Sequence, residues 1–208
     1  MFVTFPAGDL TLEGELALPA GAIRAAVVCH PHPQFGGDMD NPVVRAVAGA
    51  LKRAGYATLR FNFRGVGRSR KTYEQDRGEV EDVRAAVGCV MQHTHASSVT
   101  LAGYSFGAVM ALHVGIQRPE VAGLIAVALP LVAFDDFNAL FCCRTAKLFI
   151  VGDRDQFCDL AGLQQQFARL AEPKMLQVIA GADHFLVGHE AAVAKGVARF
   201  ASAETAAR

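Results

Sequence analysis

"TLAGYSFGAVM", residues 100–110, places a serine between two glycines, where an apolar run meets a segment of small residues typical of a helix. A G-x-S-x-G pentapeptide between a strand and a helix is the context of a nucleophile elbow, a sharp turn that exposes a serine hydroxyl. Glycines two positions before and two after Ser105 would let the strand and the helix approach closely. Glycine-rich turns also join strands to helices where no chemistry occurs. Other residues of the chain must therefore show whether Ser105 is a nucleophile.

Strand-like apolar segments alternate with helical patterns along the chain. We predict strands at 10–19, 24–30, 56–63, 98–103, 121–130, 146–152 and 175–181, and helices at 41–55, 78–93, 106–117, 160–171 and 190–203. The alternation predicts a doubly wound, mostly parallel sheet of about eight strands with helices on both faces. The first strand alternates between apolar and polar residues and ends at a proline, so we predict that it is an antiparallel edge strand.

The bulk composition restricts the classes of function. A chain of 208 residues is long enough for one domain over 1–208 with a single core. Lys plus Arg and Asp plus Glu each number 20, so no net charge favours nucleic acid or an anionic membrane surface. The longest apolar run, 121–134, is interrupted by Pro130 and is too short for a membrane span. We expect no signal peptide, and five cysteines without paired spacing indicate a reduced, cytoplasmic protein.

Polar residues follow two later strands at their carboxyl ends. Asp153 and Asp155 follow the strand at 146–152, and Asp183 and His184 follow the strand at 175–181. An aspartate after a strand can be a helix cap, and a lone histidine can be structural. Parallel strands, however, end at one edge of the sheet, where ligands bind, and the order serine, acid, histidine is that of a hydrolytic triad.

Five segments give the sequence a family resemblance: "VVCHPHPQFGGDMDN", "LRFNFRGVGRS", "GYSFG", "VGDRD" and "GADHF". Over essentially its whole length the sequence resembles the α/β-hydrolase superfamily, above all small bacterial hydrolases without a lid that are related to dienelactone hydrolase and to peptidase-like esterases. The resemblance implies a triad of Ser105, Asp155 and His184. The family's acid usually ends a G-x-x-D turn, which selects Asp155 and leaves Asp153 as the alternative, with a role in ordering the loop.

The segment "CHPHPQFGG", residues 29–37, occupies the position of the family's oxyanion loop, with proline in place of the usual glycine. The resemblance implies that the backbone amides of His32 and Phe106 would bind the oxyanion. Pro33 has no amide to offer, and Gln34 is the alternative donor.

The same segment admits a metal-site interpretation. His30 and His32, together with Asp38 and Asp40, superficially suggest a metallohydrolase. We instead expect the histidines to brace the loop by hydrogen bonds, and we predict no metal and no cofactor.

Two further features are predicted to be structural. The glycine-rich loop at 61–70 carries three arginines but lacks the Gly-Lys-Ser/Thr ending of a phosphate-binding loop. We expect Arg64 to form a structural ion pair, with contact to a substrate carboxylate as the alternative. Cys158 is expected to be a packed thiol.

The predicted function is hydrolysis of a small carboxylic ester or thioester through an acyl-enzyme. The segment 131–144 is too short for a lid domain, so we expect an open pocket. Its apolar wall is predicted to include Phe106, Phe134 and Phe185. The alternatives are a peptidase or perhydrolase with the same triad, or a catalytically silent binding scaffold. We expect a monomer or small homo-oligomer with a small-molecule substrate.

Overall fold

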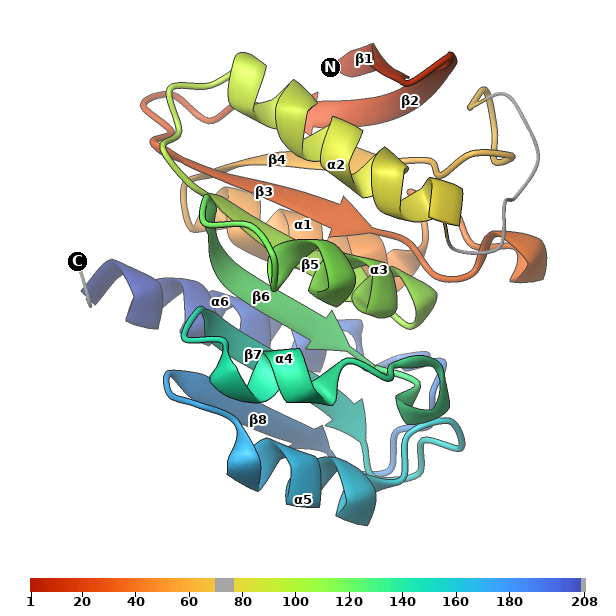
Figure 1. Ribbon diagram of the computed structural model, residues 1–208, viewed down its shortest axis with the longest axis vertical. Helices are drawn as coiled ribbons and strands as arrows, with labels where there is room; N and C mark the ends of the chain where they lie inside the picture. Colours follow the sequence, from red (N-terminus) through yellow and green to blue (C-terminus); the bar gives the residue numbers. More distant parts are fainter. Residues whose placement is uncertain (70–76, 207–208) are drawn as a thin grey trace.

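The computed structural model describes residues 1–69 and 77–206, which contain an eight-stranded sheet covered by helices on both faces (Figure 1). The strand order is β1-β2-β4-β3-β5-β6-β7-β8. The strands are β1 (Phe2–Ala7), β2 (Leu10–Ala17), β3 (Arg24–Cys29), β4 (Tyr56–Phe61), β5 (Val99–Tyr104), β6 (Val121–Val127), β7 (Ala146–Gly152) and β8 (Lys174–Ile179). The strands from β3 to β8 pair in parallel, which confirms the predicted doubly wound sheet.

The helices divide between the two faces of the sheet. Helices α1 (Pro42–Arg53) and α6 (Glu190–Ala206) cover one face, and α2 (Arg77–Gln92), α3 (Phe106–Gly115), α4 (Phe137–Cys142) and α5 (Leu160–Arg169) cover the other (Figure 1). Every residue of β5 is buried, because this central strand is covered from both sides. Its continuous apolar sequence is what a strand buried on both faces requires.

The predicted edge position of the first strand is wrong. Strand β2 lies between β1 and β4 and is antiparallel to both, so β1 is the edge strand. Residues 2–7 carry little strand signal because Pro6 lies within them. An edge strand tolerates a proline, since its outer amides need no partner in the sheet.

The parallel strands all point to the same edge of the sheet, and the connecting loops at that edge carry the residues of interest (Figure 1). Between β6 and β7 the chain forms a 3₁₀ turn, Leu131–Ala133, and the six-residue helix α4. As expected from its length, this segment therefore adds only a turn and a brief helix at that edge, and no lid domain. No helix in the described part of the chain has the length and hydrophobicity that a membrane span requires.

Candidate active site

Ser105 occupies the turn between β5 and α3 in a backbone conformation that L-residues rarely adopt. Its φ is 54° and its ψ is −119°, which costs a non-glycine residue about 1–3 kcal/mol. The amide of Ser105 donates to the carbonyl of Val127 at the end of β6, at 2.9 Å. Hydrogen bonding of the sheet therefore continues into the turn and holds the strained residue in place.

The two glycines of the pentapeptide are required by close backbone contacts. A Cβ atom on Gly103 would lie 2.1 Å from the carbonyl oxygen of Gly107, and one on Gly107 would collide with the end of β3. Any larger residue would push the helix away from the strands. The glycines therefore permit the turn that presents the Ser105 side chain at the edge of the sheet.

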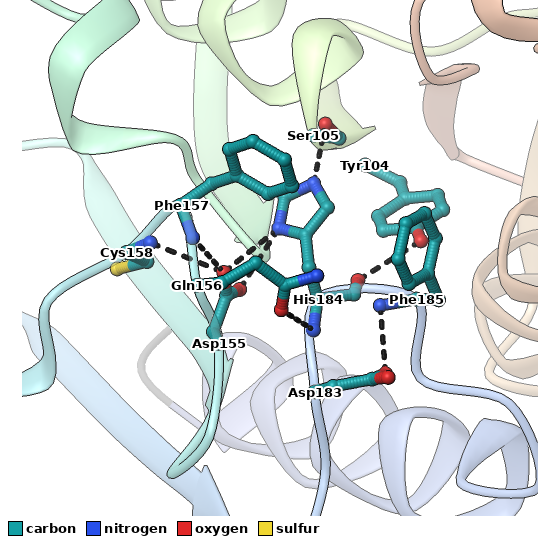
Figure 2. Close-up of polar contacts among 9 residues, drawn as sticks. All are labelled: Tyr104, Ser105, Asp155, Gln156, Phe157, Cys158, Asp183, His184 and Phe185. Carbon is teal, nitrogen blue, oxygen red and sulfur yellow. Dashed lines mark hydrogen bonds and ion pairs between the residues drawn. The ribbon is translucent and has the colours of Figure 1, made fainter.

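Three side chains from three strand ends form one hydrogen-bonded chain (Figure 2). The Oγ atom of Ser105 lies 2.8 Å from Nε2 of His184, and Nδ1 of His184 lies 2.9 and 3.0 Å from the two carboxylate oxygens of Asp155. Because the carboxylate can only accept, Nδ1 carries the proton and Nε2 accepts from the serine hydroxyl. This is the geometry in which an imidazole can remove the proton of a nucleophilic hydroxyl.

The Asp155 side chain is fully buried in the turn after β7. Its Oδ1 atom also accepts hydrogen bonds from the amides of Phe157 at 2.9 Å and Cys158 at 3.1 Å. A buried charge is tolerated only when such partners replace water. The turn therefore both fixes the carboxylate and orients it toward His184.

Asp153 has a different partner. Its Oδ1 atom accepts a hydrogen bond from the amide of Gly181 at 2.7 Å, and so links the turn after β7 to the loop after β8. Of the two aspartates between which the sequence left a choice, Asp155 contacts the imidazole, whereas Asp153 orders the backbone nearby.

His32 lies beside the start of α3, in the loop after β3. Its ring centroid is 4.9 Å from that of Phe106, and it begins the 3₁₀ turn Pro33–Phe35. The amide of Gln34, the alternative oxyanion donor, donates to Nδ1 of His32 at 3.2 Å. The loop after β3 and the first turn of α3 are thus packed together beside Ser105.

His30 is a buried brace. Its Nε2 atom accepts a hydrogen bond from the amide of Phe63 at 3.0 Å, and Nδ1 lies 2.6 Å from the carbonyl oxygen of Pro31, to which it donates. Burial lowers the pKa of His30 from 6.5 to about 4, so the ring is neutral near pH 7. The loop-bracing role expected from the sequence is confirmed for this residue.

The other residues of the metal-site interpretation have separate partners. Asp38 accepts from the amide of Asp40 at 2.8 Å, and Asp40 pairs with Arg60 at 2.6 Å. Among residues 1–69 and 77–206, no group of three or more histidine, cysteine, aspartate or glutamate side chains is arranged to hold a metal ion.

The three phenylalanines predicted to line a pocket differ in exposure. Phe185 is 56% exposed, and its ring centroid lies 5.9 Å from that of His184. Phe106 is buried against His32.

Phe134 is only 3% exposed and packs against His113 and Phe137, so its ring belongs to the core.

Three neighbours of His184 are not among the predicted site residues. Phe157 is 47% exposed, and its ring centroid lies 4.7 Å from that of the imidazole. Tyr104 and Gln156 form hydrogen bonds with the backbone of His184 (Figure 2). All three residues lie within two positions of Ser105 or Asp155 in the sequence, which marks them as residues of the site but does not specify their contacts with His184.

Two other expectations about single residues are confirmed. Arg64 forms a buried ion pair with Asp82, at 2.7 Å, which fixes the start of the loop after β4 to α2. Cys158 is buried, and burial raises the pKa of its thiol to about 12, so it is a packed, unreactive group. Arg70, the third arginine of this loop, lies outside the described residues.

Comparisons with known proteins show the family to which the chain is related. Residues 25–205 match the family described as alpha/beta hydrolase domain. An uncharacterised protein from Rickettsia prowazekii is 34% identical over 168 residues, which cover 77% of this chain and 71% of that protein. The solved structure of an alpha-beta serine hydrolase homologue from Coxiella burnetii is 33% identical, with a TM-score of 0.87 over 96% of both chains. A serine hydrolase without a lid from Xanthomonas campestris is 30% identical, with a TM-score of 0.80 over 96% of this chain and 94% of that chain.

Proposed function

The chain belongs to the alpha/beta hydrolase family, and from this premise we propose that it cleaves small carboxylic esters or thioesters through a Ser105–His184–Asp155 triad. The lidless fold expected from the resemblance is confirmed by the family match and by the serine hydrolases of similar structure. The observation that carries the proposal is the 2.8 Å contact between Ser105 Oγ and His184 Nε2, continued to Asp155.

In the first step, Ser105 attacks the carbonyl carbon of the substrate. Nε2 of His184 takes the hydroxyl proton while the Oγ–carbon bond forms, and the carbonyl electron pair moves onto oxygen. Asp155 holds the imidazole in the tautomer that can accept this proton and stabilises its cationic form.

The oxyanion would be bound by the backbone amides of Phe106 and His32. Phe106 is the first residue of α3, where amides point out of the helix toward a developing anion. The loop bearing His32 packs against Phe106, which supports a pair of donors on one side of Ser105. Each such donor lowers the barrier by about 3 kcal/mol.

In the second step, the tetrahedral intermediate collapses. The bond to the leaving alcohol or thiol breaks, and the imidazolium returns its proton to that group. A water molecule then attacks the acyl-enzyme with His184 again as base, releasing the acid and restoring Ser105. Each step uses only side chains, backbone amides and water.

The apolar part of the substrate would contact Phe185 and Phe157, whose exposed rings flank His184. Phe106 would close the site on the side of the oxyanion loop. Because the segment between β6 and β7 adds no lid domain, the acyl group would remain partly exposed. This favours small or surface-bound acyl groups over long buried chains.

A fluorophosphonate probe tests the nucleophile directly. We expect the probe to modify Ser105 and the Ser105→Ala variant to remain unlabelled and inactive while folding normally. A panel of p-nitrophenyl esters, acyl thioesters and aminoacyl amides then identifies the reaction. Faster turnover of the amides would indicate a peptidase instead of an esterase. If the probe failed to label the folded parent protein, the catalytically silent scaffold would be favoured.

A further inference from the structure

The backbone of His184 is held on both sides by side chains from two other strand ends (Figure 2). The hydroxyl of Tyr104 donates to the carbonyl oxygen of His184 at 3.0 Å. The amide of His184 donates to Oε1 of Gln156 at 3.3 Å. Both backbone polar groups of the histidine are therefore fixed by residues distant in sequence, in addition to the contacts of its ring.

Each of these two residues is a direct neighbour of another member of the hydrogen-bonded chain. Tyr104 ends β5 and precedes Ser105, whereas Gln156 follows Asp155 in the turn after β7. The end of β5, beside Ser105, and the turn that carries Asp155 thus both bind the backbone of His184. A shift of either segment would be transmitted to His184.

We propose that Tyr104 and Gln156 are positioning residues that hold the imidazole of His184 in line between Ser105 and Asp155. The kinetic part of this inference rests on the proposed function, whereas the geometric part concerns the order of the ring. The bond to Asp155 would by itself fix only Nδ1 of His184, and the imidazole could still rotate about this atom. Two bonds to the backbone fix the position from which the side chain extends.

The chemistry of Tyr104 suits a permanent donor. The residue is 4% exposed, and burial raises the pKa of its hydroxyl to about 12, with the charges of Asp155 and Asp183 acting in the same direction. The hydroxyl therefore keeps its proton at every pH at which an esterase would operate. Loss of this donor would leave the buried carbonyl of His184 without its protein partner.

The loop after β8 is ordered by contacts within the loop and with the core. The carboxylate of Asp183 accepts from the amide of Phe185 at 3.0 Å, and the side chain of Leu186 is buried in the core with its backbone at a φ of 55°. Tyr104 and Gln156 connect this preformed loop to the two segments with which its histidine must align.

The kinetic test compares Tyr104→Phe and Gln156→Leu with the parent protein on a p-nitrophenyl ester. We expect kcat to fall by roughly tenfold in each variant with little change in KM, because a displacement of a fraction of an ångström mainly affects the reacting geometry. Gln156→Glu keeps an oxygen acceptor and should restore most of kcat. Its added charge should also move the pH dependence of kcat to higher pH.

Tyr56→Phe is the matched control. Tyr56 is also a buried tyrosine, and its hydroxyl donates to Glu204 at 2.6 Å, but it begins β4 at the opposite edge of the sheet. We expect this variant to lose comparable stability and to keep the parent's kcat. Equal kcat values in Tyr104→Phe and Tyr56→Phe at equal stability would overturn the positioning role of Tyr104.

Nuclear magnetic resonance of histidine-labelled protein provides a readout that does not need turnover. We expect one ring tautomer for His184 in the parent, with a slowly exchanging Nδ1 proton, and faster exchange in Tyr104→Phe and Gln156→Leu. If the parent has no activity but the two variants show the faster exchange, the proposed function fails and the positioning role stands. Unchanged spectra in both variants would overturn the positioning role whether or not the protein is an esterase.

Discussion

Gly107 lies so close to the end of β3 that a Cβ atom built on it would come within 2.4 Å of the carbonyl oxygen of Cys29. The first turn of α3 therefore touches the backbone of the strand that leads into the loop carrying His32. This contact fixes the distance between Ser105 and that loop, and it depends on the absence of one methyl group.

Gly107→Ala is expected to destabilise the protein by about 1–3 kcal/mol, because backbone atoms must move to admit the methyl group. Gly88→Ala is the matched control: Gly88 lies in α2, and a Cβ atom there meets nothing within 4 Å. Alanine is the better helix former, so this control should stabilise the protein by about 1 kcal/mol. Urea unfolding of both variants measures the difference, and a neutral Gly107→Ala would contradict the close packing.

The strain at Ser105 leads to a second prediction. Ser105→Ala removes the hydroxyl but keeps a side chain at a φ of 54°, whereas Ser105→Gly also relieves the strain. We expect both variants to be inactive and the glycine variant to be more stable than the alanine variant by about 1 kcal/mol. Equal unfolding midpoints would indicate that the turn stores no strain.

The contrast between Asp155 and Asp153 gives a third prediction. Asp155→Asn should lower kcat by roughly 10³- to 10⁴-fold, because the amide can no longer select the tautomer in which Nδ1 of His184 carries the proton. Asp153→Asn keeps an oxygen for the amide of Gly181 and should change kcat little. Steady-state kinetics with both variants checks the assignment, which would be reversed by the opposite pattern.

The buried histidine of the loop after β3 predicts how stability depends on pH. Because burial lowers the pKa of His30 to about 4, the unfolded chain binds a proton below pH 6.5 that the folded protein does not bind. Stability contributed by the neutral ring is complete above pH 6.5 and is lost as pH falls toward 4, to the extent of about 3 kcal/mol.

His30→Asn tests this linkage by urea unfolding between pH 4 and pH 7. The variant should be less stable at pH 7, because the amide of Phe63 loses its partner, but its stability should fall less steeply as the pH is lowered. Substitution of the exposed His95 controls for the removal of a histidine as such. Parallel curves for the parent and His30→Asn would exclude the buried ring as the source.

The sequence could predict the edge at which the site lies but not its finer contacts. In a parallel sheet, residues that follow the strands lie at one edge, so the shared edge of Ser105, Asp155 and His184 follows from the parallel direction of their strands. The choice between Asp155 and Asp153 depends on the dihedral angles of one turn, which residue spacing does not specify.

The contact between Tyr104 and His184 could not be predicted for a different reason. It joins residues 80 positions apart through a backbone carbonyl, and a carbonyl leaves no mark in the sequence. Strand β1 was missed because Pro6 suppresses the strand pattern, although the edge position of β1 makes that proline harmless.

The exposed ring of Phe157 leads to the last prediction, which concerns the acyl group. Each methylene that leaves water contributes up to about 0.8 kcal/mol. Because the ring of Phe157 is half-exposed, it would bury about half of each methylene, and kcat/KM should rise by roughly twofold for each carbon added from acetate to hexanoate. Phe157→Ser should flatten this dependence and leave acetate hydrolysis nearly intact. Phe2→Ser is the control, since Phe2 is also an exposed phenylalanine, at 69% against 47% for Phe157, but lies on the edge strand β1. If Phe157→Ser and Phe2→Ser kept the parent's chain-length dependence alike, the acyl group would have to lie elsewhere on the rim.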